Sequence, residues 1–224
     1  MEGHLHAAFL EDPALHLPIV VLLVSGGHTM LICMQEAVPG AVEYRLLGQT
    51  VDDAAGEAFD KVSRFLGLGY PGGPAIERIA VNGKPDAIAF PRGLAGQGYD
   101  FSFSGLKTAV VRFMRANPTA GLPDVAASFQ EAVVDVLVAK ARKAARETAA
   151  KAICIGGGVA ANSALRDRVA KICQEDGRDA FIPSRAMCTD NAAMIGATAW
   201  YRLQADGPTP LDVAVDPNLA LPLV

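Results

Sequence analysis

The spacing of hydrophobic and polar residues along the chain predicts both strands and helices. Two runs of mostly aliphatic residues, 19–24 and 29–34, flank a short glycine-containing segment, which predicts a β-hairpin. Further strands are predicted at 42–47, 99–104, 151–155 and 180–182, and helices at 1–10, 52–68, 74–80, 105–116, 124–148, 162–175 and 189–203. Three successive strands, followed by a last third in which strands and helices alternate, indicate an α/β protein with a mixed sheet.

Composition narrows the class of protein. With 224 residues, 51% of them hydrophobic, and a net charge of -4, the chain can bury a large core and is not disordered. Its longest aliphatic run, 18–24, is far shorter than the roughly 18 residues that a membrane-spanning helix needs. Four cysteines and no targeting segment at the N-terminus lead us to expect a cytoplasmic protein with free thiols. The acidic balance provides no general attraction for nucleic acid, so RNA binding would need a local patch or a partner.

Two glycine segments lie where a backbone could approach a ligand. Residues 25–28 connect the first two strands, and residues 156–158 connect a buried strand to a helix. Glycines there let N–H groups reach an anion or a carbonyl, and a strand–glycine–helix junction is a common nucleotide site. The alternatives are a hairpin turn that needs positive φ and close packing of a helix on the sheet. The segment 156–158 matches neither a dinucleotide fingerprint nor a phosphate-binding P-loop.

Two charged groups of residues have both a structural and a functional interpretation. Asp53, Glu57, Asp60 and Arg64 share one face of a helix that leads into the loop 70–74. A carboxylate beside such a loop can hold ribose hydroxyls, although a merely solvated face is the more common arrangement. The second group lies near the end of the longest predicted helix and comprises Lys140, Arg142, Lys143, Arg146 and Lys151. Those charges complement the helix dipole, and contact with RNA is the alternative.

Metal-ligating residues are few. His4 and His6 lack the i, i+4 spacing that places two imidazoles on one helix face. Asp190 opens a predicted helix, where it could cap the helix or bind a metal. The cysteines show no paired spacing, which excludes a zinc finger.

Six segments occur in order along the chain: Leu23–Thr29, Asp52–Lys61, Tyr70–Pro74, Phe101–Thr108, Gly156–Asn162 and Cys188–Ile195. Taken together, they closely resemble the bacterial TsaD family, also called Gcp. The resemblance extends over essentially the whole chain. It implies an α/β fold of the sugar kinase/Hsp70/actin-like type, which has two ribonuclease H-like halves. It also implies an acyltransferase that moves a threonylcarbamoyl group from threonylcarbamoyl-AMP to N6 of the adenine 3′ of the anticodon, in tRNAs reading codons that start with A.

The same resemblance implies site residues and partners. Substrate-binding positions would be Leu23, Val24, Ser25, Gly26, Gly27, Asp60, Gly73 and Asn162, and metal ligands would be His4 and Asp190. The implied metal is Fe2+. The implied partners are tRNA, the adenylate donor, a homologous dimerising subunit (TsaB-like) and a small ATPase subunit (TsaE-like), with no membrane.

The sequence also departs from the family pattern. That pattern is His-Met-x-Gly-His, and this sequence starts at its Met. We therefore expect residues 1–18 to be a remnant of the first half, and residues 19–224 to be the remaining ribonuclease H-like core with a helical insertion at about 70–150. With the first histidine and the first third of a family member absent, weak metal binding and impaired activity are expected.

Other classes of function remain as alternatives. They are a non-catalytic interaction subunit or an inactive fragment of the same family, a metalloprotease, and a kinase or carbamoyltransferase of the same fold. The presence of His4 and Asp190 favours descent from a catalytic member of the family, because the non-catalytic paralogue lacks the metal ligands. Glu2 lies in the wrong register to serve as the base of a metalloprotease.

Overall fold

A five-stranded sheet forms the centre of the computed structural model, which describes residues 2–11, 16–38, 41–214 and 216. The strands are β1 (Ile19–Val24), β2 (Thr29–Val38), β3 (Ala41–Gln49), β4 (Ala152–Gly156) and β5 (Asp179–Phe181). Their order in the sheet is β3-β2-β1-β4-β5. The β1–β2 and β2–β3 pairs are antiparallel, whereas β4 pairs parallel with both β1 and β5. The predicted hairpin is confirmed, with Ile19 opposite Met34 and Val24 opposite Thr29.

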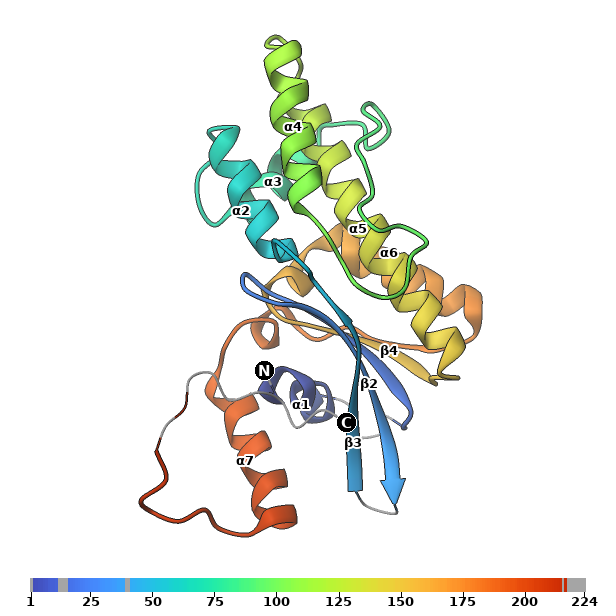
Figure 1. Ribbon diagram of the computed structural model, residues 1–224, viewed down its shortest axis with the longest axis vertical. Helices are drawn as coiled ribbons and strands as arrows, with labels where there is room; N and C mark the ends of the chain where they lie inside the picture. Colours follow the sequence, from blue (N-terminus) through green and yellow to red (C-terminus); the bar gives the residue numbers. More distant parts are fainter. Residues whose placement is uncertain (1, 12–15, 39–40, 215, 217–224) are drawn as a thin grey trace.

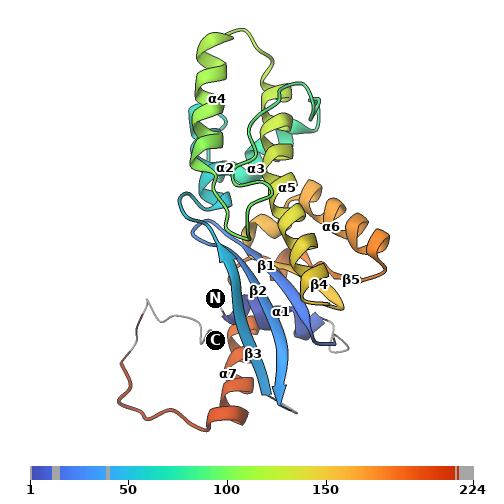
Figure 2. The same ribbon diagram turned by 45° about the vertical axis from the view of Figure 1, so that its right-hand side comes forward.

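Helices cover both faces of this sheet and extend beyond one end of it (Figures 1 and 2). They are α1 (Glu2–Glu11), α2 (Ala55–Phe65), α3 (Gly72–Ala80), α4 (Ser104–Ala116), α5 (Leu122–Glu147), α6 (Ser163–Asp176) and α7 (Ala192–Asp206), with short 3-10 turns η1 (Gly158–Ala161) and η2 (Arg185–Met187). The α1 and α7 helices pack together on one face, and α5 and α6 lie on the other (Figure 1). The α2, α3 and α4 helices rise with the first half of α5 above the sheet (Figure 2).

The hydrophobic core has two layers because β1 is buried on both faces. Val20 and Leu22 belong to the large cluster under α5 and α6, whereas Val21 and Leu23 belong to a smaller cluster with Leu5 of α1. Successive strand residues point to opposite faces, so a strand covered on both sides is hydrophobic throughout. This burial explains the unbroken aliphatic run in the sequence.

Two predictions near the site were wrong. Residues 99–104 form no strand, and only an isolated bridge joins Phe101 to Thr50. Helix α7 begins at Ala192, and the side chain of Asn191, not Asp190, caps it by accepting from the N–H of Met194 at 3.0 Å. Asp190 is therefore not needed as a cap.

Three members of the basic run on α5 make contacts within the protein, which gives them structural roles other than the predicted complement to the helix dipole. Lys140 is buried, and its ammonium donates to the carbonyl oxygens of Leu94 (2.9 Å) and Gln97 (2.7 Å). Arg142 and Arg146 both bind Asp176, and these guanidinium groups hold the pKa of that carboxyl well below its usual range. Within the described residues, no helix combines the length and the apolar character needed to cross a membrane.

Candidate functional site

A cavity of about 360 Å³ lies where the β1–β2 turn, α2, α3 and the segment after β4 meet. Four of the predicted substrate positions line it: Gly26, Asp60, Gly73 and Asn162. They come from four different elements separated by up to 136 positions in the sequence, as the numbers 26 and 162 show. The fold therefore brings together residues that the resemblance had assigned one by one.

Two glycines allow the backbone segments around this cavity to approach each other closely. A Cβ at Gly56 would lie 2.5 Å from the carbonyl oxygen of Ser25, and one at Gly157 would lie 2.4 Å from that of Val24. Gly157 also has a φ of +85°, which other residues rarely adopt. By contrast, a Cβ at Gly26 or Gly73 would meet nothing within 4 Å, so their backbone faces open space.

The predicted substrate loop 23–27 divides into a buried part and an open part. Leu23 and Val24 end β1 with buried side chains, so they position the turn rather than present side chains to a ligand. The N–H of Ser25 is taken by the carbonyl of His28 at 2.8 Å, which closes the turn. In the described part of the chain, no hydrogen bond involves the N–H groups of Gly26 and Gly27, which leaves two donors for a ligand.

Asp60 has a structural contact as well as a place in the cavity. Its Oδ1 accepts from the N–H of Gly72 at 2.7 Å, which fixes the start of α3 against α2. The other carboxylate oxygen has no hydrogen-bond partner among the described residues. Asp60 can therefore hold the loop and still accept from a ligand hydroxyl.

The side chain of Asn162 makes two hydrogen bonds within the protein. Its Oδ1 accepts from the N–H of Leu165 at 3.1 Å and caps α6, while its Nδ2 donates to Gln130 at 2.8 Å. Its side chain thus anchors the end of the glycine segment, and one amide hydrogen remains for a ligand.

The structure adds cavity residues that sequence reasoning missed. Glu77 of α3 accepts from the N–H of Ser163 at 2.8 Å, Tyr70 is 80% exposed, and Arg185 of η2 forms part of the cavity wall. Arg166 connects this wall to the glycine segment by donating to the carbonyls of Ala160 (3.2 Å) and Pro183 (2.8 Å). Tyr70 begins the segment Tyr70–Pro74 that carries the resemblance, and Glu77 lies four residues after Gly73 on the same helix, so both had a sequence signal, whereas Arg185 had none.

The two predicted metal ligands meet beside the cavity. His4 Nε2 of α1 lies 3.2 Å from Asp190 Oδ1, and Thr189, the neighbour of Asp190, lines the cavity. Burial lowers the pKa of His4 below its ordinary value, and the Asp190 carboxylate raises it in part. His4 Nδ1 is buried without a hydrogen-bond partner. A neutral imidazole and a carboxylate suit Fe2+ as ligands. Among the described residues, no third His, Cys, Asp or Glu completes the group.

His6 does not supply a third ligand. Its Nε2 lies 2.7 Å from the hydroxyl of Tyr44 on the sheet, and its ring packs 4.7 Å from that of Tyr201. The α1 helix is held against α7 by Glu2, which binds Arg202 at 3.0 Å. These contacts fix the helix that carries His4 relative to the segment that carries Asp190.

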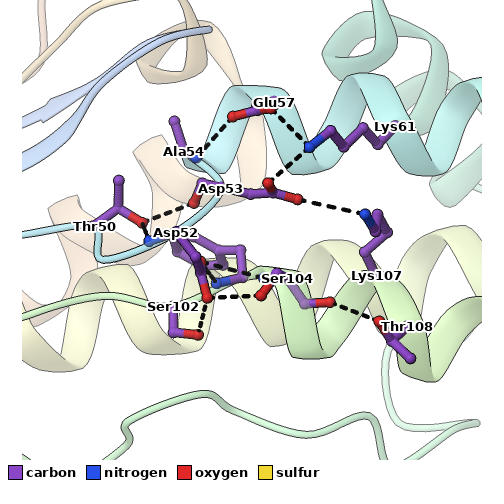
Figure 3. Close-up of polar contacts among 11 residues, drawn as sticks. Thr50, Asp52, Asp53, Ala54, Glu57, Lys61, Ser102, Ser104, Lys107 and Thr108 are labelled. Atoms are coloured by element: carbon purple, nitrogen blue, oxygen red, sulfur yellow. Dashed lines mark hydrogen bonds and ion pairs between the residues drawn. The ribbon is translucent and has the colours of Figure 1, made fainter.

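A second polar cluster joins the segment before α2 to the start of α4 (Figure 3). Asp52 accepts from the N–H of Phe103 at 2.8 Å and from the hydroxyls of Ser102 (2.5 Å) and Ser104 (2.7 Å). Burial raises the pKa of Asp52, but these donors outweigh it and leave the pKa below its usual range. Asp53 binds Lys61 at 2.7 Å. The cluster therefore has a structural role in fixing α2, one wall of the cavity.

Comparison with solved structures identifies the fold. T. kodakarensis HypF superposes with a TM-score of 0.65 over 89% of this chain and 36% of that protein, at 14% identity. Full-length HypF in its phosphate- and nucleotide-bound form gives a TM-score of 0.68 over 93% and 36%, at 11% identity. These likenesses confirm the predicted sugar kinase/Hsp70/actin-like fold.

Comparison of sequences identifies the family. Residues 1–197 match the family model described as tRNA N6-adenosine threonylcarbamoyltransferase. The Thermotoga neapolitana protein of that name is 47% identical over 99% of this chain and 67% of its own length, and the Moorella thermoacetica protein is 49% identical over 98% and 64%. The chain thus spans about two thirds of the length of these curated relatives. It belongs to the TsaD family of tRNA N6-adenosine threonylcarbamoyltransferases.

Proposed function

We propose that this protein transfers a threonylcarbamoyl group from threonylcarbamoyl-AMP to N6 of the adenine 3′ of the anticodon, in tRNAs reading codons that start with A. The observation that carries the proposal is the convergence of Gly26, Asp60, Gly73 and Asn162 on one cavity, beside the His4–Asp190 pair. The cavity would take the adenylate, with the carboxylate of Asp60 near the ribose hydroxyls.

The reaction needs little covalent help from the protein. N6 of the adenine attacks the carbamoyl carbon, a C–N bond forms, the C–O bond to the phosphate breaks, and AMP leaves while N6 loses a proton. Because AMP is already a good leaving group, orientation and stabilisation of charge are the main requirements. Gly26 lines the cavity, and its free N–H, with the free N–H of the adjacent Gly27, can stabilise charge that develops on an oxygen of the donor.

We propose that His4 and Asp190 hold an Fe2+ ion. When bound, the ion would act as a Lewis acid toward an oxygen of the donor. His4 can bind as the neutral imidazole because burial lowers its pKa. With two ligands from the described residues, we expect weak binding, because removing even an outer-shell partner of a metal site costs about 10- to 100-fold in affinity.

Metal binding tests this part of the proposal. His4→Ala and Asp190→Ala should each lower the Fe2+ content measured by elemental analysis after anaerobic reconstitution. His16→Ala is the matched control, since His16 is exposed and has no place in the site. Equal metal content in His4→Ala and His16→Ala would contradict the assignment.

We propose tRNA, a homologous dimerising subunit and a small ATPase subunit as partners, and the cytoplasm as the location. The net charge of -4 supports a need for partners in tRNA binding. Filter binding at increasing salt checks this point: tight, salt-sensitive binding of tRNA by the isolated chain would contradict it.

Mass spectrometry of tRNA nucleosides tests the activity. Unmodified tRNA is incubated with the protein, its partner subunits and threonylcarbamoyl-AMP, then digested to nucleosides. Because weak metal binding is expected, we expect a low yield of N6-threonylcarbamoyladenosine with the unchanged chain, an equal yield with Asp212→Ala, an exposed control, and a large loss with Asp190→Ala. Unmodified adenosine in every sample, with partner binding intact, would instead support the non-catalytic interaction subunit.

A further inference from the structure

Arg185 is held at the wall of the donor cavity by side chains that the family assignment does not mention. Its Nη2 donates to Ser163 Oγ at 2.9 Å. The backbone N–H of the same serine donates to Glu77 at 2.8 Å, so η2, α6 and α3 are connected at this point. The guanidinium is therefore anchored at one nitrogen, while the residue remains exposed.

The charge of Arg185 is not neutralised by the protein. No carboxylate of the described residues lies within 4.0 Å of its nitrogens, whereas Arg142, Arg168 and Arg202 each bind at least one. Arg185 is also the one cationic residue among the described residues that line the cavity. The same lining contains two carboxylates, Asp60 and Glu77.

This charge distribution has a consequence for an anionic ligand. Two carboxylates repel a phosphate, and a cavity of this kind binds one only where a cation or a set of free N–H donors offsets them. A guanidinium is suited to the task because its planar set of donors matches the geometry of phosphate oxygens. Arg185 can contribute the N–H donors that Ser163 does not use.

We propose that Arg185 binds the phosphate group of the adenylate donor, and of the AMP that leaves. The proposal rests on the proposed function, because it takes the cavity as the adenylate site. The ribose lies toward Asp60 and Gly73, and the phosphate lies toward Arg185. Arg185 thereby distinguishes a nucleotide from a nucleoside.

Isothermal titration calorimetry with AMP and with adenosine tests this assignment on the full chain. Arg185→Gln removes the charge but keeps a donor for Ser163, and Arg112→Gln is the control, since Arg112 is exposed on α4 away from the cavity. Losing a hydrogen bond to a charged group should lower AMP affinity about 10- to 100-fold in Arg185→Gln. Adenosine affinity should stay within about twofold, and Arg185→Lys should recover part of the AMP affinity.

Four outcomes decide between the two proposals. Unchanged AMP affinity in Arg185→Gln would overturn the proposal, and so would equal losses for AMP and adenosine, which would indicate a contact with the base or a structural role. A wild-type chain that binds neither probe would overturn both this proposal and the proposed donor cavity. A loss of AMP affinity but not of adenosine affinity in Arg185→Gln would support the role of Arg185. If the unchanged chain also produces no modified nucleoside in the tRNA assay, the proposed function is contradicted while the role of Arg185 stands.

Discussion

Replacing Gly56 with alanine should destabilise the protein, although alanine is the better helix former. Gly56 is the second residue of α2, and its N–H donates to the carbonyl of Ser25 at 3.2 Å. A Cβ would lie 2.5 Å from that oxygen and 2.8 Å from the Cα of Gly26, both of them backbone atoms that cannot rotate away. The gain in helix propensity is about 0.4–1 kcal/mol, and the overpacking costs about 1–3 kcal/mol. We therefore expect a net loss of about 1–2 kcal/mol in the free energy of unfolding.

Gly105 provides a matched control for this change. It is the second residue of α4, it is exposed, and a Cβ there would meet nothing within 4 Å. Gly105→Ala should raise the free energy of unfolding by up to about 1 kcal/mol. Urea unfolding measures both variants, and calorimetry with AMP should show weaker binding only in Gly56→Ala, because the β1–β2 turn must move. Equal stability of the two variants would refute the reasoning.

Three further predictions follow from individual contacts. Asp60→Asn keeps an acceptor for the N–H of Gly72, so it should lose only about 1 kcal/mol in urea unfolding while its adenosine affinity falls; unchanged affinity would mean that Asp60 only supports the loop. Lys140→Met should lower the free energy of unfolding by about 1.5–3 kcal/mol, because the carbonyls of the 94–98 loop lose a charged donor; urea unfolding equal to wild type would contradict this. Burial raises the pKa of Tyr44 to about 12 and that of Cys173 to about 11. The unfolded chain loses these protons at a lower pH than the folded chain does. The stabilisation that the two neutral groups contribute should therefore be fully present below about pH 9 and decrease as the pH rises toward 11; a flat profile of urea midpoints would be inconsistent with this.

The strands could be predicted because burial and sequence pattern agree there. The aliphatic run of β1 is covered on both faces, and the glycine turn after it fixes the hairpin register. The prediction failed at 99–104, where the alternation of aromatic and polar residues suggested a strand. Phe101 and Phe103 are indeed buried, but the N–H of Phe103 is taken by Asp52 from a distant segment, so no ladder forms.

The sequence pattern singled out separate parts of the candidate site, the glycine segments 25–28 and 156–158 and the helix face with Asp60, but only the resemblance assigned them to one site. No spacing rule connects His4 to Asp190 or Gly26 to Asn162, because these pairs meet only after the chain has folded around the sheet. Arg185 gave no signal at all in the sequence. Its significance comes from which charges surround it, and that depends on contacts with α3 and α6 rather than on its neighbours in the chain.

A crystal structure of the protein with a non-hydrolysable analogue of threonylcarbamoyl-AMP shows where the adenylate binds. We expect the analogue in the 360 Å³ cavity, with its ribose within hydrogen-bond distance of Asp60 and its phosphate within hydrogen-bond distance of Arg185. Its carbamoyl end should lie toward the N–H groups of Gly26 and Gly27. An analogue bound outside this cavity, or inside it with the phosphate turned away from Arg185 and the ribose away from Asp60, would contradict the account.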